Sequence, residues 1–280
     1  MSVPSSEISI AEALAWGRKH IQPSEARLLL RHVCRTSSAH LAAWPEKTLP
    51  ISQWEAFRHL AERRAAGEPI AYLIGEREFY GRDFLVNAAV LIPRSETELL
   101  IELAVAHFAA VPCPKILDLG TGSGVIAITL ALELDRPEIT AIDASRDALA
   151  LASTNALRFG VGITFLWSDW YALLKREDRF HLIVANPPYI IESDPHLGQG
   201  DLRFEPLAAL ASGQDGLRAL TAIITDAGRY LEDSGWLFLE HGYNQAAAVR
   251  ALLADAGFAD IASWKDIAGI ERVSGARWTG

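Results

Sequence analysis

The sequence predicts an α/β protein, in which helices cover both faces of a mostly parallel sheet and a small helical module comes first. Three observations support this fold class. From residue 115 onward, apolar runs of strand length alternate with runs of helical periodicity. Those strands are apolar throughout, which is typical of a parallel sheet buried on both faces. In the first 75 residues, apolar side chains recur at helical spacing.

The chain of 280 residues is longer than a usual single domain, so we expect two domains. The predicted boundaries are a helical domain over residues 1–75, a β-hairpin linker over 76–92 and a main domain over 93–280. The linker segment is rich in strand formers and is broken by Gly81, as in a hairpin.

Local signals place the helices of the first domain. One helix is predicted to begin near Pro23, and Ser52–Glu55 fit a capping box at the start of another. Tryptophans at helical spacing usually fill a core, so Trp16, Trp44 and Trp54 are predicted to be buried.

The main domain is predicted to alternate strands and helices almost to its end. Residues 259–278 have no helix between their two apolar segments and are predicted to close the sheet as an antiparallel pair. Strands are predicted within 115–120, 138–143, 163–169, 180–189 and 235–243, and helices within 98–108, 125–134, 146–159, 217–231 and 245–258.

The net charge of −9 is unevenly distributed along the chain. Residues 1–75 hold nine Lys/Arg and seven Asp/Glu, a balance of +2, which leaves 17 basic against 28 acidic residues, or −11, for the remainder. An acidic main domain argues against an extensive phosphate-binding surface, so direct nucleic acid binding is not expected.

Signals for membranes, secretion and metals are missing from the sequence. No apolar stretch reaches the roughly 18 residues that span a bilayer. Residues 1–14 lack the basic segment and apolar core of a secretory signal, so a soluble, cytoplasmic protein is expected. Cys34 and Cys113 have no second cysteine or nearby histidine at metal-ligand spacing, and no metal site is predicted.

A glycine-rich loop follows the first strand of the main domain. In the segment ILDLGTGSGVIAI, a strand runs into Gly120, Gly122 and Gly124 and then into a helix. Glycines permit a tight turn and let a ligand approach the backbone, where the amides at a helix start are free. With Thr121 and Ser123, they are predicted to bind a nucleotide-like cofactor.

Acidic residues around this loop narrow the kind of cofactor. Asp143 follows the last glycine by about the 20 residues at which an acid meets ribose hydroxyls. Residues 122–127 also satisfy the relaxed dinucleotide pattern, so the loop alone leaves NAD open. Asp118 argues against NAD, because a carboxylate before the glycines repels pyrophosphate but attracts an ammonium group such as that of S-adenosylmethionine. Asp169 is predicted to accept a hydrogen bond from the adenine amino group, and the Trp170 ring to flank the base. The alternative is that the two residues form a capped turn whose tryptophan belongs to the core.

The sequence Asn186-Pro187-Pro188-Tyr189 lies where the fourth strand leaves the sheet, at the edge where ligands collect in open α/β folds. A planar amide or amine nitrogen is a poor nucleophile, and two hydrogen-bond acceptors draw it towards tetrahedral geometry. Asn186 Oδ1 and the Pro187 carbonyl supply them, the prolines fix them in advance, and Tyr189 offers a flat face. Asn186, Pro187 and Tyr189 are therefore predicted to be catalytic, unless Pro-Pro merely ends a strand.

These motifs, in this order, resemble those of the HemK/PrmC family, the release factor glutamine methyltransferases. The similarity covers nearly the whole chain and includes ILDLGTGSG, SDW, VANPPYI, FEPLAAL, GQDGL and LEHGYNQ. The resemblance implies a class I S-adenosylmethionine-dependent methyltransferase fold, Rossmann-like, with a mostly parallel seven-stranded sheet. It also implies that the first 75 residues form a substrate-recognition domain that grips a release factor.

The resemblance further implies an activity. S-adenosylmethionine would methylate the side-chain amide nitrogen, N5, of the glutamine in the Gly-Gly-Gln motif of class 1 peptide chain release factors, which modulates translation termination. On that pattern, Gly120 to Gly124, Asp143, Trp170 and Asn186 hold the cofactor. The four residues from Asn186 to Tyr189, Pro188 included, hold the glutamine.

Some residues depart from the family pattern or keep two interpretations. Ser95 stands where the family usually has proline, and it is predicted to begin a second capping box with Glu98. Arg94 and Glu205 are candidates for contact with cofactor or partner, although a surface salt bridge explains them nearly as well. The weakly patterned stretch around residues 204–216 is expected to close over the target or to be disordered.

Three other functions fit parts of the sequence. An amino-methyltransferase acting on adenine N6 or guanine N2 of DNA or RNA can use the same Asn-Pro-Pro-aromatic clamp after base flipping, but the acidic charge argues against it. A non-catalytic adaptor would bind cofactor and use the helical module for protein contacts, which leaves the intact clamp unexplained. An NAD-dependent oxidoreductase would bind NAD in place of S-adenosylmethionine.

Overall fold

The computed structural model describes residues 8–280, whose contacts divide the chain into two compact units, 1–75 and 76–280. Residues 1–7, which are part of the segment searched for a secretory signal, lie outside the described residues. Within residues 8–280, no helix is long and apolar enough to cross a membrane.

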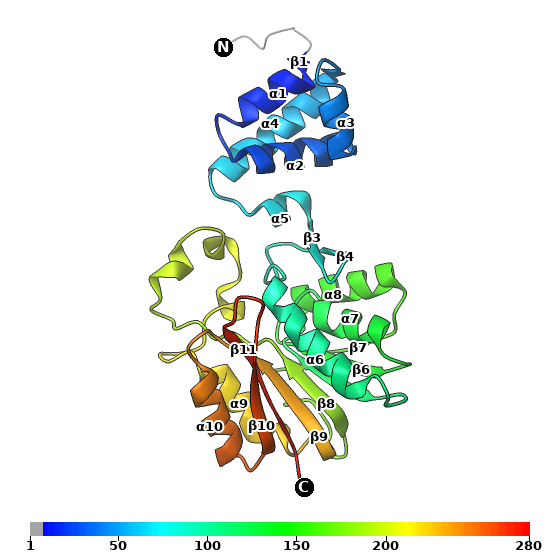
Figure 1. Cartoon of the computed structure of the whole chain (residues 1–280), viewed down its shortest axis with the longest axis vertical. Helices are drawn as coiled ribbons and strands as arrows, with labels where there is room; N and C mark the ends of the chain where they lie inside the picture. The colour runs from blue at the N-terminus through cyan, green and yellow to red at the C-terminus, as the bar shows by residue number, and fades with distance from the viewer. Residues whose placement is uncertain (1–7) are drawn as a thin grey trace. The chain divides into compact units, whose positions relative to one another are not determined.

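The first unit consists of short helices around one apolar core (Figure 1). The helix α2 begins at Pro23 as predicted, because proline has no amide hydrogen to leave unbonded at the first helical position. Leu29 and Leu30 of α2 and Phe57 of α4 are fully buried in this core. The elements are β1 (Ile8–Ser9), α1 (Ile10–Gly17), α2 (Pro23–Cys34), α3 (Ser38–Ala43), β2 (Thr48–Leu49), α4 (Ile51–Ala65) and α5 (Ile70–Ile74), and β1 pairs with β2.

The capping box predicted for this unit is in the wrong place. Ser52 is not the cap, because α4 already begins at Ile51, with Pro50 as its N-cap and no side-chain capping bond. The capping box of this unit lies instead at α1, between Ser9 and Glu12.

The tryptophans of the first unit do not all fill the core. Trp16 and Trp54 pack against it, with ring centroids 5.2 Å apart. Trp44 is 53% exposed, contrary to the prediction. It follows the six-residue helix α3 as its C-cap, so helical spacing does not turn its ring inward.

The second unit is built on a seven-stranded sheet with the order β10-β11-β9-β8-β5-β6-β7. Neighbouring strands from β5 to β9 are parallel, and β11 is antiparallel to β9 and β10, as predicted. The order reverses at β5 and β8, where open α/β sheets bind ligands. The strands are β5 (Lys115–Leu119), β6 (Glu138–Asp143), β7 (Thr164–Trp167), β8 (Phe180–Ala185), β9 (Leu231–Glu240), β10 (Ala259–Lys265) and β11 (Glu271–Arg277).

Helices cover both faces of this sheet (Figure 1). Side chains of β5 alternate between two apolar clusters, with Ile116 in the first and Leu117 and Leu119 in the second. Both faces are therefore buried, which explains the continuous apolar runs of the strands. The first cluster includes α6 (Glu98–Phe108), α7 (Val125–Glu133) and α8 (Arg146–Phe159), and the second includes α9 (Arg218–Ala227) and α10 (Ala246–Asp255).

The predicted hairpin consists of β3 (Glu76–Phe79) and β4 (Arg82–Leu85). Asn155, a fully buried residue of α8, joins it to the glycine-rich loop. Its Oδ1 accepts a hydrogen bond from Leu85 N–H, and its Nδ2 donates to Leu85 O and Ser123 O. The hairpin is thus anchored to the rest of the second unit.

The turn before α6 differs from the prediction. Residues Ser95–Thr97 form a 3-10 turn without a side-chain cap, and Ser95 Oγ donates to Glu96. Glu98 accepts a hydrogen bond from Tyr80 N–H instead of closing a capping box. The predicted second capping box is therefore wrong.

The long segment between β8 and α9 is closed at its base by backbone bonds. Ile190 pairs with Ala211 in a parallel bridge, and Glu192 N–H donates to Gly213 O over 2.9 Å. These bonds hold the two ends of the segment together, and the residues between them form a loop that extends from the sheet (Figure 1). Its 3-10 turns are η2 (Pro195–Gly198), η3 (Leu202–Phe204) and η4 (Leu207–Ala209).

Candidate active site

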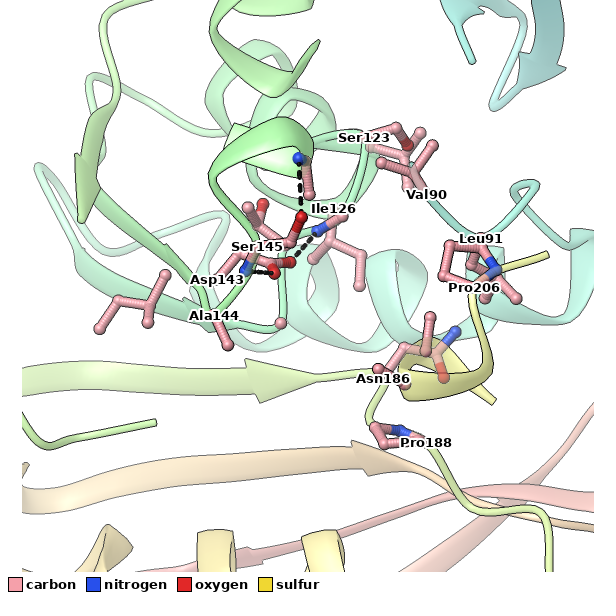
Figure 2. Close-up of a pocket in the computed structure, with 18 of the residues that line it drawn as sticks. Val90, Leu91, Ser123, Ile126, Asp143, Ala144, Ser145, Asn186, Pro188 and Pro206 are labelled. Carbon is pink, nitrogen blue, oxygen red and sulfur yellow. Dashed lines mark hydrogen bonds between the residues drawn. The ribbon is translucent and has the colours of Figure 1, made fainter. Parts of the chain in front are cut away.

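A cavity of about 370 Å³ lies at the carboxyl ends of β5, β6 and β8 within the second unit. Its size suits a small-molecule ligand. In Figure 2, Asp143 and Ser145 lie on one side of it, and Asn186 and Pro188 lie on another. The cavity therefore brings the glycine-rich loop and the Asn-Pro-Pro-Tyr segment to one place.

Most of the predicted site residues line this cavity, but four do not. Those that do are Gly120, Thr121, Gly122, Ser123, Asp143, Asp169, Trp170, Asn186 and Pro188. Asp118, Gly124, Pro187 and Tyr189 are not among the residues that line it.

The glycine-rich loop needs glycine at two positions for different reasons. A Cβ on Gly124 would lie 2.9 Å from Ile128 Cδ1 and 3.2 Å from Ala152 Cβ, so the loop packs on α7 and α8 too closely for a side chain. Gly122, at a φ of 56°, would meet nothing within 4 Å. The space beside Gly122 allows a ligand to approach the backbone.

Asp143, at the end of β6, is held by the backbone around the cavity. Its Oδ2 accepts from Gly122 N–H over 2.9 Å, and its Oδ1 accepts from Ser145 N–H over 2.8 Å (Figure 2). Burial raises the pKa of Asp143, against which these two backbone bonds act. Each oxygen keeps a further lone pair, so the carboxylate can accept bonds from two ligand hydroxyls.

Trp170 and an apolar wall form a slot next to Asp143. A Cβ on Gly120 would lie 3.6 Å from the Trp170 ring, so the indole lies beside the loop. Ile126 and Ala148 line the same cavity, and Asp169 is exposed at its rim. A flat heterocycle fits such a slot, and Asp169 is available to accept from an exocyclic amine.

The charges that line the cavity select against a pyrophosphate. They are the carboxylates of Asp143 and Asp169 and the guanidinium of Arg94. Arg94 forms an ion pair with Glu205, so its charge is already compensated. A cationic ligand is favoured here over a dinucleotide, which argues against the NAD alternative.

Asp118 is a buried carboxyl directly behind the loop. Its Oδ2 accepts from Thr121 Oγ1 over 2.7 Å, whereas its Oδ1 has no hydrogen-bond partner among the described residues. Burial raises the pKa of Asp118 to about 7, and nearby Asp143 raises it as well, against the bond from Thr121. Ionised Asp118 therefore costs stability, and a nearby cation would reduce that cost.

We expect Asp118→Asn to stabilise the protein above pH 7. Because its pKa is raised on folding, Asp118 contributes stability that is fully present below its unfolded pKa of 3.8 and is lost as the pH rises through about 7. The free energy of unfolding of the variant should exceed that of the wild type by about 1–4 kcal/mol at pH 8 and should equal it at pH 3.5. Urea unfolding at both pH values measures this, with the exposed Asp255→Asn as control. Equal stability at pH 8 would show that Asp118 is not destabilising when ionised.

A chain of hydrogen bonds holds the side chains of the Asn-Pro-Pro-Tyr segment. Asn186 Nδ2 donates to Thr97 Oγ1 over 3.1 Å, and Thr97 Oγ1 donates to Glu240 Oε2 over 2.7 Å. Tyr189 OH donates to Glu240 Oε1 over 3.1 Å. Among residues 8–280, no donor is bonded to Asn186 Oδ1. That oxygen is therefore left to accept from a ligand.

Glu240 lies at the centre of this chain because β9 is the parallel neighbour of β8, with Ala185 opposite Leu239. The two strand ends thus place Asn186 and Glu240 side by side. Burial raises the pKa of Glu240 to about 7, and the bonds from Thr97 and Tyr189 lower it. Sequence reasoning missed Thr97 and Glu240, although a carboxylate at the end of an apolar strand was a usable signal.

The backbone of the segment is supported by two residues of later loops. Gln245 Nε2 donates to Tyr189 O over 3.0 Å, and Gln245 Oε1 accepts from Gly242 N–H. Gly216 lies against the same carbonyl, because a Cβ there would be 2.4 Å from Tyr189 O. This contact explains why a glycine stands in the Gly213-Gln-Asp-Gly216 sequence.

Arg94 and Glu205 form a salt bridge, one of the two interpretations given for them, but Glu205 is buried, so the pair does not lie on the surface. The Glu205 side chain is 0% exposed, pairs with Arg94 and accepts from Ile92 N–H over 3.0 Å. These contacts join the segment that follows Leu91 to the loop at Pro206, and Leu91 and Pro206 both line the cavity (Figure 2).

We expect Glu205→Ala to lower the free energy of unfolding by about 1–3 kcal/mol, because Ile92 N–H and Arg94 lose their acceptor. The Arg94 side chain is 33% exposed and can be rehydrated, which keeps the loss below that of a fully buried pair. Chemical denaturation measures the change. Asp135→Ala removes the exposed pair with Arg136 and should change stability by less than about 1 kcal/mol. Equal effects of the two variants would refute the buried role of Glu205.

His241 lies outside the cavity. Its Nδ1 and Nε2 are hydrogen-bonded to Gly242 O and Ser274 Oγ, over 2.9 and 2.8 Å. Burial lowers its pKa, which favours the neutral ring. These contacts give His241 a structural place at the end of β9.

Known proteins resemble this chain over most of its length. Residues 12–75 match the PrmC N-terminal domain, and residues 95–199 match the Methyltransferase small domain. A release factor glutamine methyltransferase from Bordetella pertussis is 49% identical over 90% of this chain and 93% of its own length. The chain belongs to the release factor glutamine methyltransferase family. A relative of that name from Shewanella oneidensis is 41% identical over 97% of this chain and 96% of its own length.

The family assignment agrees with the fold of the second unit. The structure of the T. thermophilus 16S rRNA methyltransferase, solved with AdoMet and guanosine, is similar to this one with a TM-score of 0.54. The alignment covers 72% of this chain and 49% of that chain, at 20% identity. At that identity the likeness concerns the fold. The second unit therefore has the predicted class I S-adenosylmethionine-dependent methyltransferase fold, with a seven-stranded sheet.

Proposed function

We propose that this chain transfers a methyl group from S-adenosylmethionine to the side-chain amide nitrogen of a glutamine, the one in the Gly-Gly-Gln motif of class 1 release factors. The observation that carries the proposal is the Asn186 carboxamide at the cavity. Its Nδ2 is used by Thr97, and its Oδ1 is left to accept from a flat NH₂ group. The names of the relatives support release factors as the substrates.

The residues around the cavity fit the parts of S-adenosylmethionine. Asp143 would accept from the ribose hydroxyls, Trp170 would flank the adenine, and Asp169 would accept from its amino group. The open backbone at Gly122 would lie beside the remainder of the ligand. Asp118 would act on the ammonium group only through its charge, because Thr121 separates it from the cavity.

The chain itself would activate the amide by holding it. S-adenosylmethionine supplies, when bound, a methyl group on a positively charged sulfur. Asn186 Oδ1 and the Pro187 carbonyl would accept the two amide hydrogens, which draws the nitrogen lone pair out of conjugation. Pro187 and Pro188 fix the backbone in advance, so little further ordering is needed when the glutamine binds. After transfer, the methylated nitrogen becomes acidic and loses its proton to water.

Tyr189 and the first unit would serve the substrate in different ways. The Tyr189 ring is held by its bond to Glu240 and would support the glutamine side chain. Burial raises the pKa of the Tyr189 hydroxyl, so it stays protonated and is not a general base. The first unit is proposed to be the substrate-recognition domain that grips the release factor away from the reacting glutamine, with residues 76–92 as the linker.

A transfer assay tests this function. The protein is incubated with methyl-labelled S-adenosylmethionine and a class 1 release factor, or with the factor whose motif glutamine is changed to alanine. Label should enter only the unchanged factor, and peptide mass spectrometry should locate the methyl group on that glutamine. Parallel incubations with duplex DNA and with RNA test the alternative that the methyl acceptor is a base of a nucleic acid. Label in nucleic acid alone, or equal labelling of both factors, would refute the proposal.

A further inference from the structure

We propose that Thr97 and Glu240 are positioning residues, which determine which end of the Asn186 carboxamide faces the substrate. The inference rests on the proposed function for its catalytic consequence. It adds two residues from elements outside the Asn-Pro-Pro-Tyr segment, one before α6 and one at the end of β9.

The direction of the hydrogen bonds carries the argument. An ionised carboxylate has no proton to donate, so the Thr97 hydroxyl must donate to Glu240 Oε2. The Thr97 oxygen can then only accept from Asn186, which requires Nδ2 rather than Oδ1 to face it. The carboxamide oxygen is thereby turned away from Thr97, as the activation of a substrate NH₂ group requires.

The reverse orientation would disable the clamp. If the Asn186 carboxamide rotated by half a turn, its NH₂ would face the NH₂ of the substrate, and two donors do not bond. The two orientations have nearly the same shape, so packing alone discriminates poorly between them. A polar partner with a fixed direction is needed, and Thr97, which is 2% exposed, has that direction set by Glu240.

The surroundings of Glu240 bear on its charge. Its Oε1 accepts from Tyr189, so both oxygens are occupied by donors. Arg272 on β11 favours the ionised form, and Glu96 on the turn before α6 disfavours it. If Glu240 binds a proton, its hydroxyl can donate to Thr97, and the Thr97 hydroxyl is then free to donate to Asn186 Oδ1.

The first test compares two substitutions at Thr97. Thr97→Val keeps the shape and removes the hydroxyl, whereas Thr97→Ser keeps the hydroxyl. We expect kcat to fall about 10- to 100-fold in Thr97→Val, as when a group that orients a functional side chain is removed, with KM for the release factor unchanged. Thr97→Ser should restore kcat. Wild-type kcat in Thr97→Val, or equal losses in both variants, would overturn the inference.

The second test uses pH. In the wild type, kcat should fall as the pH decreases through about 7. Once Glu240 is protonated, the hydrogen bonds that link it through Thr97 to Asn186 no longer have a fixed direction. Glu240→Gln cannot ionise, so this step should disappear from its profile. Asp255→Asn, which removes an exposed carboxyl at the end of α10, is the control and should keep the step. A step that survives in Glu240→Gln contradicts the inference.

The third test needs no turnover and separates this inference from the proposed function. The side-chain ¹⁵NH₂ signals of Asn186, assigned by their loss in Asn186→Ser, are followed by NMR in the protein without substrate. They should shift with pH through the titration of Glu240 in the wild type and stay constant in Glu240→Gln. Signals that are unchanged by Thr97→Val would overturn the inference, even if the transfer assay succeeds. If transfer fails while these shifts occur, the proposed substrate is wrong and the positioning role stands.

Discussion

Replacing Asn186 with alanine should lower kcat about 100- to 1000-fold, the usual loss when one fixed hydrogen-bond partner of a reacting group is removed. The substitution deletes the acceptor Oδ1 at the cavity, and the Pro187 carbonyl alone cannot hold both amide hydrogens. Thr97 Oγ1 loses only a donor, Asn186 Nδ2, and keeps its bond to Glu240. The fold should therefore survive the change.

The measurement is single-turnover transfer to a release factor at saturating S-adenosylmethionine. Asn244→Ala, an exposed asparagine near the end of β9, is the matched control and should keep wild-type turnover. Thermal unfolding of both variants checks that they are folded. Turnover within a few-fold of the wild type in a folded Asn186→Ala protein would mean that the clamp does not activate the amide.

Gly216→Ala should disrupt the active site by a clash with the backbone of the Asn-Pro-Pro-Tyr segment. A Cβ at this position would be 2.4 Å from Tyr189 O and 2.6 Å from Gln245 Nε2, and the backbone φ of 75° disfavours any side chain. Because Tyr189 O belongs to the backbone of the Asn-Pro-Pro-Tyr segment, the clash must displace that segment. We expect a loss of about 1–2 kcal/mol for the left-handed conformation and a further 1–3 kcal/mol for overpacking.

Gly213→Ala isolates the clash from the backbone strain. Gly213 has the same φ of 75° in the same loop, but its Cβ would lie 3.4 Å from Arg218 Cβ, which is ordinary contact. Gly213→Ala should therefore lose only the stability that the left-handed conformation costs, and its kcat should be near that of the wild type. Gly216→Ala should lose stability and also kcat, by about 10-fold or more, since small displacements of reacting groups are costly. Equal kcat in the two variants would refute the supporting role of Gly216.

The sequence by itself determined the fold class and most of the cavity. Apolar strands, helical periodicity and the glycines of the loop are local patterns, and they predicted the sheet and the loop at Gly120 to Gly124. The Asn-Pro-Pro-Tyr segment was also found from local chemistry. In an open parallel sheet the carboxyl ends of neighbouring strands share one edge, so strand order alone brings these segments together.

Predictions from local sequence patterns were wrong where the structure gave a side chain another partner or ended a helix before it. Ser95 and Glu98 have the spacing of a capping box, yet Glu98 accepts from Tyr80 N–H in the hairpin. Trp44 has an aromatic side chain that usually fills a core, but α3 ends before it. In both cases, the competing partner or the helix end is set by residues that the local pattern does not include.

Only the tertiary structure decided what supports the site. Thr97 and Asn186 are 89 residues apart, and Thr97 and Glu240 are 143 apart. Glu205 is likewise 111 residues from Arg94 and lies in a loop that showed little pattern. A hydrogen bond depends on distance and direction in space, which sequence spacing does not encode across separate elements. The sequence therefore predicted which groups react, and only the folded chain shows which groups are hydrogen-bonded to them.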